Sequence, residues 1–403
     1  EADHAIDLGP GAGRRGGRVT FTGTPAELWE SETATGDHFS LRKRVMIPEP
    51  RPVPEAFLTV RGAHLRNLRG VDIALPLGRL TVVTGVSGSG KSTLVEDVLT
   101  ASLDRGKSVG CDALDGPELK VVMVDQSPIG RNPRSNPATY TKLSDIIRDA
   151  FAAATGLSTS HFSFNRPEGA CPACKGIGAV EVKMRYLPST WIPCAECEGR
   201  RFRDEVLEAT AAFGEEELSI ADVYGMSIAE AAPLILASEH LSKKQKRAAR
   251  RILRALRDIG LGYLNLGQPS PTLSGGEAQR VKLAKFLGRR GLAKRMLVLD
   301  EPSTGLHPKD ISGLLTVVDR LVRSGATVVV VEHNTDIIRA ADWIVDLGPG
   351  AGPEGGDLIY AGPPEGLLST PESMTAQALL NEDRIQPVEA VSRRKNSETV
   401  LME

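Results

Sequence analysis

The sequence predicts an α/β fold built on a mostly parallel sheet. Four short, continuous apolar runs are typical of parallel strands that are buried on both faces. These runs are residues 80–84, 120–125, 296–299 and 327–331. A glycine-rich stretch, Gly85 to Thr93, follows the first run directly and precedes a helical pattern. Two Cys-x-x-Cys pairs lie between the second run and the third, so an insertion into the sheet domain is expected there.

Composition limits the classes of protein to be considered. The 403 residues suffice for two or three domains, and the net charge of −2 restricts any nucleic-acid contact to a local basic surface. Four of the five cysteines belong to the two pairs, which leaves Cys111 alone and argues against a disulfide-stapled secreted fold. The sequence shows neither a signal peptide nor an apolar run long enough for a membrane span. A cytoplasmic protein without a membrane partner is expected.

The glycine-rich stretch has the residues and the context of a phosphate-binding loop. Its glycines let backbone amides turn toward phosphates, Lys91 supplies a positive charge, and Ser92 can ligate Mg²⁺. A strand, a loop and a helix in this order give the motif its meaning. ATP and Mg²⁺ are the expected ligands, and the residues expected to bind ATP here are Gly85, Ser87, Gly88, Gly90, Lys91, Ser92 and Thr93.

Polar residues that follow the other apolar runs complete a nucleotide site. Asp300 ends the run 296–299 and is expected to hold the same magnesium ion, which makes it part of the ATP site. Glu301 beside it is placed to polarise the attacking water. His333 lies just past the next run and could contact the γ-phosphate, and Gln126 could report the nucleotide state to the insertion. Glu301, His333 and Gln126 are therefore the catalytic candidates.

A third motif, in residues 273–284, begins Leu-Ser-Gly-Gly-Glu. It resembles the signature segment of the ABC ATPase superfamily, and that resemblance implies that it meets the γ-phosphate bound by the opposite cassette. A hydroxyl and free amides at a helix start suit an anion. The expected residues of this segment, acting in trans, are Ser274, Gly275, Gly276 and Glu277.

The two cysteine pairs predict a metal site. Cys171, Cys174, Cys194 and Cys197 form paired Cys-x-x-Cys knuckles, each followed by a glycine, and four thiolates can close on one zinc ion. A closed site of this kind would stabilise a small protrusion rather than do chemistry. Redox-active cysteines are the alternative interpretation.

An internal repeat links the two ends of the chain. Residues 2–17 and 341–356 share the pattern Ala-Asp-x-x-x-Asp-Leu-Gly-Pro-Gly-Ala-Gly-x-x-Gly-Gly. Because the second copy follows the ATPase motifs, we interpret the first copy as the end of another cassette whose body lies upstream. A duplicated hairpin without such a body is the alternative.

These features together suggest a division of the chain. The expected parts are 1–46 as the end of a first cassette, 47–56 as a Pro-rich linker, 57–150 and 263–375 as the two parts of an ATP-binding core, 151–262 as an insertion with the zinc module and a helical signature region, and 376–403 as a flexible tail.

The assembled motifs closely resemble the C-terminal half of the UvrA family, over nearly the whole chain. The most specific passages are 125–140, Phe162-Ser-Phe-Asn165, the cysteine quartet and 266–280. The resemblance implies an ABC-type ATPase with two cassettes paired head to tail, which dimerises and senses damage in duplex DNA for nucleotide excision repair. It also implies that later repair proteins receive the lesion and that the chain has no nuclease chemistry of its own.

Two surfaces are candidates for the DNA contact. Arg131 and Arg134 lie in the loop after Gln126. A helix expected over residues 241–259 carries the further candidates Lys244, Arg247 and Arg251. Its apolar side is expected to comprise Leu241, Ala248, Ile252, Ala255, Leu256 and Ile259. A merely solvated cationic face is the alternative for this helix.

Two other functions remain as alternatives. UvrA proteins usually place a Lys and an Arg a few residues before the Phe-Ser-Phe-Asn passage, whereas residues 152–161 contain neither. A UvrA-like paralogue that gives resistance to DNA-binding antibiotics is therefore one alternative. A soluble ABC ATPase that drives a membrane or ribosomal partner is the alternative from another class, and the zinc insertion argues against it.

Overall fold

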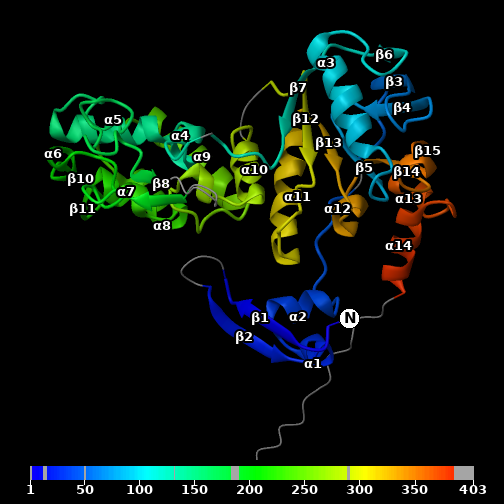
Figure 1. The fold of residues 1–403 in the computed structure, drawn as a ribbon, viewed down its shortest axis with the longest axis horizontal. Coiled ribbons are helices and arrows are strands. Elements are labelled where there is room, and N and C mark those ends of the chain that lie inside the picture. The colour runs from blue at the N-terminus through cyan, green and yellow to red at the C-terminus, as the bar shows by residue number, and fades with distance from the viewer. Residues whose placement is uncertain are drawn as a thin grey trace, which may run out of the picture.

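The computed structural model describes residues 2–11, 16–49, 51–130, 132–182, 190–287 and 291–384. A six-stranded sheet in the order β15–β14–β5–β13–β12–β7 forms its centre (Figure 1). In that order the strands are Asp357–Gly362, Trp343–Gly348, Leu80–Gly85, Thr327–Val331, Arg295–Asp300 and Lys120–Val124. All neighbours pair in parallel except β15, which is antiparallel to β14. The four predicted strands and the α/β class are confirmed.

The central strands are buried on both faces, which explains why their sequences do not alternate. In β12, Leu297 and Leu299 lie in one core cluster, whereas Met296 and Val298 lie in another. Helix α11 (Pro308–Arg323) packs in the first cluster. The second cluster contains the helical segment η2 (Thr93–Thr100) and the sheet β4–β3–β6. The strands of that sheet are Val71–Pro76, Phe57–Ala63 and Ala113–Asp115.

Short helices complete the cassette around the sheet. They are α3 (Ala101–Arg105), α12 (Thr335–Arg339), η4 (Gly352–Glu354), α13 (Pro364–Leu367) and α14 (Met374–Asp383). Helix α14 corrects the expected flexible tail, because Ala376 and Leu379 are buried against the cassette. The polar residues of this helix conceal its narrow apolar stripe in the sequence. The remainder of the expected tail, 385–403, lies outside the described residues.

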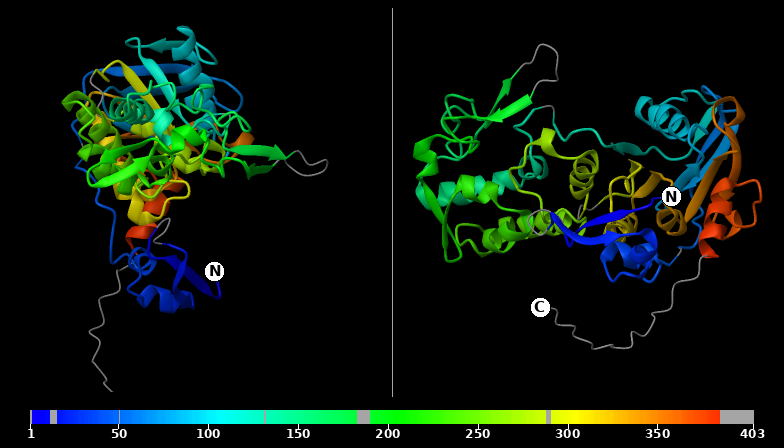
Figure 2. Two further views of the ribbon diagram at one scale, coloured as in Figure 1. Left: turned by 90° about the vertical axis from the view of Figure 1, so that its left-hand side faces the viewer. Right: turned by 60° about the horizontal axis from the view of Figure 1, so that its bottom comes forward.

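Between β7 and β12 the chain forms an elongated insertion, on the left of Figure 1. Its elements are α4 (Pro137–Thr141), α5 (Leu143–Thr155), β8 (Ala179–Val182), β9 (Thr190–Pro193), α6 (Asp204–Leu207), β10 (Thr210–Phe213), β11 (Glu216–Ser219), α7 (Ile220–Gly225), α8 (Ile228–Ala237), α9 (Lys243–Asp258), η3 (Ser270–Thr272) and α10 (Gly275–Ala284). The hairpin β8–β9 projects from it (Figure 2). Among the described residues, no helix has the length and apolar character to cross a bilayer.

The insertion begins earlier than expected. Phe151 packs against Phe162 and Phe213 with ring centroids 5.3 Å apart in both pairs. A boundary at residue 151 would therefore cut α5 and separate Phe151 from its own turn of helix. The true start lies at or before α4, and Asn132-Pro133 and Asn136-Pro137 were the signals in the sequence that marked it.

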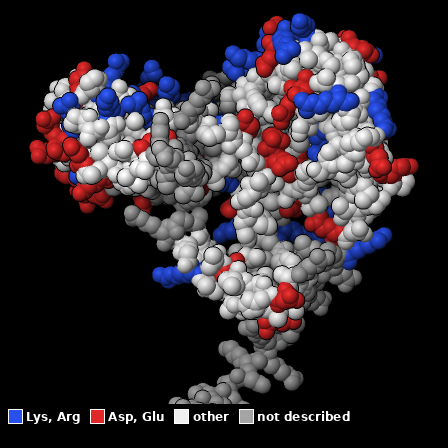
Figure 3. Space-filling view, in the orientation of Figure 1, with Lys and Arg blue, Asp and Glu red and all other residues white. Residues whose placement is uncertain are grey.

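Helix α9 presents a slightly different apolar face from the expected one. Ala249 and Leu253 are fully buried, whereas Ala248 and Ile252 are only partly buried. Leu241, Ala255, Leu256 and Ile259 are buried as expected. Lysine and arginine side chains gather on the upper side of the insertion, and acidic side chains gather at its far end over α6, β10 and β11 (Figure 3).

The N-terminal residues form a small unit below the cassette in Figure 1. It comprises the hairpin of β1 (Ala5–Gly9) and β2 (Arg18–Gly23), followed by α1 (Pro25–Glu30) and α2 (Ala34–Phe39). Among the described residues of 47–56, none belongs to a helix or strand.

The linker is anchored to the cassette by a buried ion pair. The Arg51 guanidinium donates to both carboxylate oxygens of Asp342, at 2.9 and 3.2 Å, and the Arg51 N–H donates to the same carboxylate at 3.0 Å. Asp342 also accepts from the Leu80 N–H at 2.8 Å, so it ties the linker to the start of β5. The Asp342 side chain is only 2% exposed.

Arg51→Met should destabilise the cassette by about 3 kcal/mol, because the substitution leaves the buried Asp342 carboxylate without its cationic partner. The matched control is Arg61→Met, which breaks a pair with Asp115 between two well-exposed side chains. Removing that pair should cost about 0–1 kcal/mol. Urea unfolding followed by circular dichroism measures both, and equal midpoints for the two variants would contradict the anchoring role.

Candidate nucleotide and metal sites

Parallel pairing brings the predicted nucleotide residues to one edge of the sheet. The carboxyl ends of β5, β13, β12 and β7 all point the same way. The phosphate loop follows β5, His333 follows β13, Asp300 ends β12, and Gln126 follows β7. In open parallel sheets, ligands bind at this edge. Residues 126, 300 and 333 are far apart in the sequence, but they lie at the ends of three neighbouring strands.

The phosphate loop is tightly held around Lys91. The Lys91 ammonium donates to the carbonyls of Gly85 and Val86, at 3.0 and 2.8 Å, and burial lowers its pKa. The charges of Glu301, Asp346 and Asp300 oppose that shift. Gly85 has a φ of +125°, and a Cβ there would lie 2.0 Å from the Leu347 carbonyl oxygen. Only glycine fits at this position.

The loop containing the second repeat braces the phosphate loop, which sequence reasoning missed. The Gly352 N–H donates to the Gly88 carbonyl, and the Gly356 N–H donates to the Ser89 carbonyl, both at 3.0 Å. The Asn67 side-chain amide donates to Gly88 at 3.2 Å and to Gly352 at 3.3 Å. The repeated glycines in the sequence were a signal of close backbone approach.

The acidic residues after β12 lie within electrostatic reach of Lys91. Burial raises the pKa of Asp300, and the charges of Glu301 and Asp125 add to that rise. Glu301 is exposed, has a φ of +41°, and donates its N–H to the Val331 carbonyl at 2.9 Å. Burial and the charge of Lys91 lower the pKa of His333. Lys91, Asp300, Glu301 and His333 therefore form one group.

Glu332 holds two of the loops that carry this group, and the sequence analysis did not identify it. It is buried, and its carboxylate accepts from three backbone N–H groups. These are Ser303 at 2.8 Å, His333 at 2.7 Å and Asn334 at 2.9 Å. One carboxylate thereby joins the loop after Glu301 to the loop that carries His333. Its position directly after an apolar strand was the only sequence signal.

The signature segment caps α10 beside Gln126. Ser274 Oγ accepts from the Glu277 N–H at 3.2 Å, and the Glu277 carboxylate accepts from the Ser274 N–H at 2.7 Å. A Cβ on Gly275 would lie 2.9 Å from Gln126 Oε1, and one on Gly276 would lie 2.9 Å from the Thr304 carbonyl. The helix start therefore contacts both loops. Gln279, a further residue that the sequence did not reveal, donates to the carbonyls of Val124 and Asp300.

The four cysteines converge as the sequence predicts. Their sulfur atoms all lie within 4.8 Å of one another, and the residues are buried. Cys174 Sγ and Cys197 Sγ are 3.7 Å apart, close to the ~3.8 Å edge of a tetrahedron with Zn–S bonds of ~2.3 Å. The Gly178 N–H donates to Cys174 Sγ and the Arg201 N–H donates to Cys197 Sγ. Such donors stabilise thiolates, so the donor set fits a metal ion such as zinc.

The DNA candidates separate into two groups. Arg134 lies at a hollow of about 470 Å³ whose lining also includes Asn132, Ser135, Thr139, Tyr140, Lys142, Asn165 and Lys285. Lys244, Arg247 and Arg251 lie on the exposed face of α9, and none of them lines this hollow. Arg131 lies outside the described residues.

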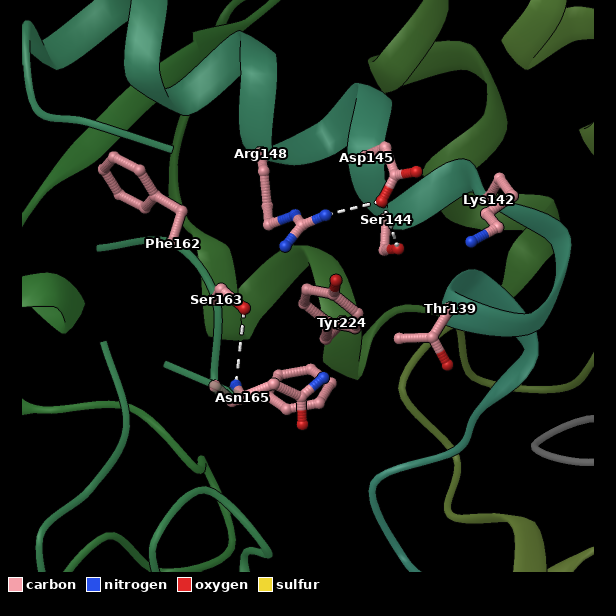
Figure 4. A pocket seen from close by; sticks show the side chains of 10 residues that line it. Thr139, Lys142, Ser144, Asp145, Arg148, Phe162, Ser163, Asn165 and Tyr224 are labelled. Carbon is pink, nitrogen blue, oxygen red and sulfur yellow. Dashed lines mark hydrogen bonds and ion pairs between the residues drawn. The ribbon is translucent and has the colours of Figure 1, made fainter. Parts of the chain in front are cut away.

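A second hollow, of about 200 Å³, adjoins the first through Thr139, Lys142 and Asn165 (Figure 4). Arg148 extends into it from α5 toward Tyr224 and pairs with Asp145. Its lining includes the Phe162-Ser-Phe-Asn165 passage. We call the two hollows together the polar trough. Arg134 donates to the Lys175 carbonyl at 2.8 Å, which joins the trough to the first cysteine knuckle.

Glu332→Gln should lower the unfolding free energy by about 1–2 kcal/mol, because the amide nitrogen would face a backbone N–H where the carboxylate accepted. The control is Glu365→Gln on the exposed side of α13, which should leave the melting temperature unchanged. Differential scanning calorimetry compares them. Identical melting temperatures for both variants would remove Glu332 from its organising role.

Two curated relatives are similar to this chain in sequence. It is 45% identical over 397 residues to UvrABC system protein A of Staphylococcus aureus (strain COL), covering 94% of the chain and 40% of the relative. It is 46% identical over 419 residues to UvrABC system protein A of Streptomyces coelicolor, covering 99% and 40%. The chain thus spans about two fifths of the length of these relatives.

A solved structure agrees with the sequence comparison. The crystal structure of UvrA2 from Deinococcus radiodurans matches 94% of the chain and 46% of its own length, with a TM-score of 0.85 and 41% identity. No protein-family model matches the chain. The fold is an α/β P-loop cassette of the ABC type, and by sequence and fold the chain belongs to the UvrA family.

Proposed function

We propose that this chain is the ATP-hydrolysing, DNA-binding part of a UvrA-type protein that senses damage in nucleotide excision repair. The observation that carries the proposal is the direct connection between the nucleotide edge and the polar trough. Asp125 and Gln126 follow β7 at that edge, and Arg134 lies eight residues after Gln126, in the trough. Lys282 of α10 donates to Asp125 and to Ser127 Oγ, so the signature helix is tied to the same segment.

At the nucleotide edge, each side chain has a separate task. The amides of the phosphate loop and Lys91 bind the phosphates, and Ser92 and Asp300 hold Mg²⁺. Glu301 orients the attacking water and accepts its proton, and His333 contacts the γ-phosphate. Lys91 must leave the carbonyls of Gly85 and Val86 to reach a phosphate, so nucleotide binding would exchange one set of partners for another.

The signature segment is proposed to serve a nucleotide on an opposite cassette, either an upstream first cassette or a second copy of this chain. The N-terminal hairpin supports the first source. Both β1–β2 and β14–β15 change register directly after an aspartate, Asp7 or Asp346. Ile6 and Leu8 are 65% and 66% exposed, whereas their counterparts Val345 and Leu347 are buried in the sheet. A strand equivalent to β5 would cover the exposed pair.

Glu301→Gln should bind ATP with unchanged affinity but hydrolyse it at least ~100-fold more slowly, because the amide cannot accept a proton. Lys91→Ala should lose binding itself. Isothermal titration calorimetry and phosphate release separate the two effects. The specific activity of the unmodified chain should also fall on dilution, since the composite site needs two cassettes. Undiminished turnover in Glu301→Gln would exclude its assigned role.

The cysteine quartet is proposed to hold structural Zn²⁺. Cys197→Ser should lose the metal and unfold the hairpin β8–β9, because the surrounding module has few core residues of its own. Cys111→Ser, outside the quartet, should retain zinc at the unmodified stoichiometry. Zinc content by atomic absorption and tryptophan fluorescence from Trp191, which lies on β9, report both effects. Equal zinc content in the two variants would contradict the assignment.

The polar trough is proposed to contact the DNA backbone. Arg134, Lys142 and Lys285 present three cations to it, with Asn and Ser side chains between them. Lys285 also lies 4.7 Å from the Tyr140 ring, which fixes its position. Phosphate contacts of this kind bind without reading base sequence, as a sensor of distorted duplex requires.

Replacing Arg134, Lys142 and Lys285 together by Ala should weaken duplex binding and reduce the salt dependence of the association constant by ~0.9 for each DNA phosphate that these cations neutralise. The matched variant replaces Lys244, Arg247 and Arg251 by Ala, which removes the same charge from α9. Fluorescence anisotropy across a salt series should show no change in slope for that variant. The reverse pattern would move the DNA contact to α9.

A UvrA-like paralogue that confers resistance to DNA-binding antibiotics is the second candidate. The observation that favours it is the segment 152–161, which supplies no Lys or Arg beside the Phe-Ser-Phe-Asn passage. Binding that is stronger to drug-loaded duplex than to adduct-bearing duplex would support this alternative.

A further inference from the structure

The N-terminal unit contacts the loop that follows Glu301 through one histidine. His307 is the N-cap of α11, and its Nδ1 accepts from the Lys309 N–H at 3.2 Å. Its Nε2 lies 3.2 Å from Thr35 Oγ1 of α2. The His307 ring also meets the His38 ring edge-on, with centroids 5.7 Å apart. Segments 272 residues apart in sequence therefore meet at this side chain.

The direction of the hydrogen bonds follows from these contacts. Because Nδ1 accepts a hydrogen bond, the proton of the neutral ring lies on Nε2. Nε2 must then donate to Thr35 Oγ1, whose own hydroxyl donates to Asp7 Oδ1 at 2.7 Å. Asp7 also accepts from Thr20 Oγ1 at 2.9 Å. The result is a chain of two hydrogen bonds, donated from His307 to Thr35 and from Thr35 to the Asp7 carboxylate.

The internal repeat makes Asp346 the counterpart of Asp7, so the contacts of Asp346 indicate the role of Asp7. Its counterpart Asp346 accepts from Thr375 Oγ1 at 3.1 Å, and Thr375 is the second residue of α14 just as Thr35 is the second residue of α2. In the second copy, the charge of Asp346 acts on Lys91 of the phosphate loop. Asp7 is therefore the equivalent of a group that borders a phosphate-binding lysine.

We propose that His307 is a positioning residue that transmits the state of the N-terminal unit to the hydrolytic loop. The proposal rests on the ATPase function proposed above. Loop 301–307 contains Glu301 and is held at one end by Glu332 through the Ser303 N–H. The chain His307–Thr35–Asp7 holds the other end. A shift of Asp7, as when a neighbouring phosphate loop binds or loses nucleotide, would change the placement of Glu301.

Two variants separate this role from a simple structural one. His307→Asn keeps a favourable cap for α11 but is too short to reach Thr35. Thr35→Val removes the hydroxyl and preserves the side-chain shape. The controls are His240→Asn and Thr210→Val, which lie in the insertion away from these contacts.

The proposal predicts that each variant lowers kcat about tenfold, as loss of one charge-linked hydrogen bond would, and leaves the Kd for ATP unchanged. Because both residues belong to the same chain of hydrogen bonds, breaking it at one residue already removes its effect. The double variant should therefore be no slower than either single variant. Unchanged kcat in both single variants, or multiplied losses in the double variant, would overturn the proposal.

A nucleotide-independent measurement distinguishes failure of this link from failure of the proposed ATPase. Hydrogen exchange of the amides in 303–309 should be about tenfold faster in Thr35→Val than in the unmodified chain, without any nucleotide. If the unmodified chain does not bind ATP, the proposed function fails whatever this result. If it binds ATP but exchange is unchanged in Thr35→Val, the link itself is refuted.

Discussion

Parallel pairing of β5, β13 and β12 is the constraint on which the nucleotide edge depends. Three residues that carry different chemistry, Lys91, His333 and Glu301, are far apart in sequence and meet only because their strands end together. Parallel pairing also requires covered faces and long crossovers. The insertion between β7 and β12 is one such crossover, and it carries the cysteine module and the polar trough away from the sheet.

The second structural theme is that loops at this edge are held by hydrogen bonds from neighbouring segments as well as by bonds of their own. Glu332 joins two loops through three N–H groups, and Gln279 bridges two strand ends. The repeated glycine loop holds the phosphate loop from outside. Several of these loops thus share hydrogen-bond partners with a neighbouring loop or strand end. That property suits a protein whose grip on DNA is proposed to follow its nucleotide.

The sequence predicted the central strands and the cysteine cluster because their signals are local. Continuous apolar runs and fixed Cys spacing need no knowledge of distant partners. It could not predict Glu332, Gln279 or Asn67 as organisers, since their roles come from contacts between segments far apart in the chain. The sequence analysis also misplaced the start of the insertion. It misplaced the apolar face of α9 as well, because alanines in that helix offer a weak contrast between buried and exposed positions.

The central claim is that the nucleotide edge and the polar trough act together on damaged duplex. The most direct test is the affinity for duplex DNA with and without a bulky adduct, measured across a salt series in the presence of ATP. The account predicts tighter binding to the adduct-bearing duplex and a steep decline of affinity with salt. Equal affinity for the two duplexes, or affinity that does not respond to salt, would contradict it.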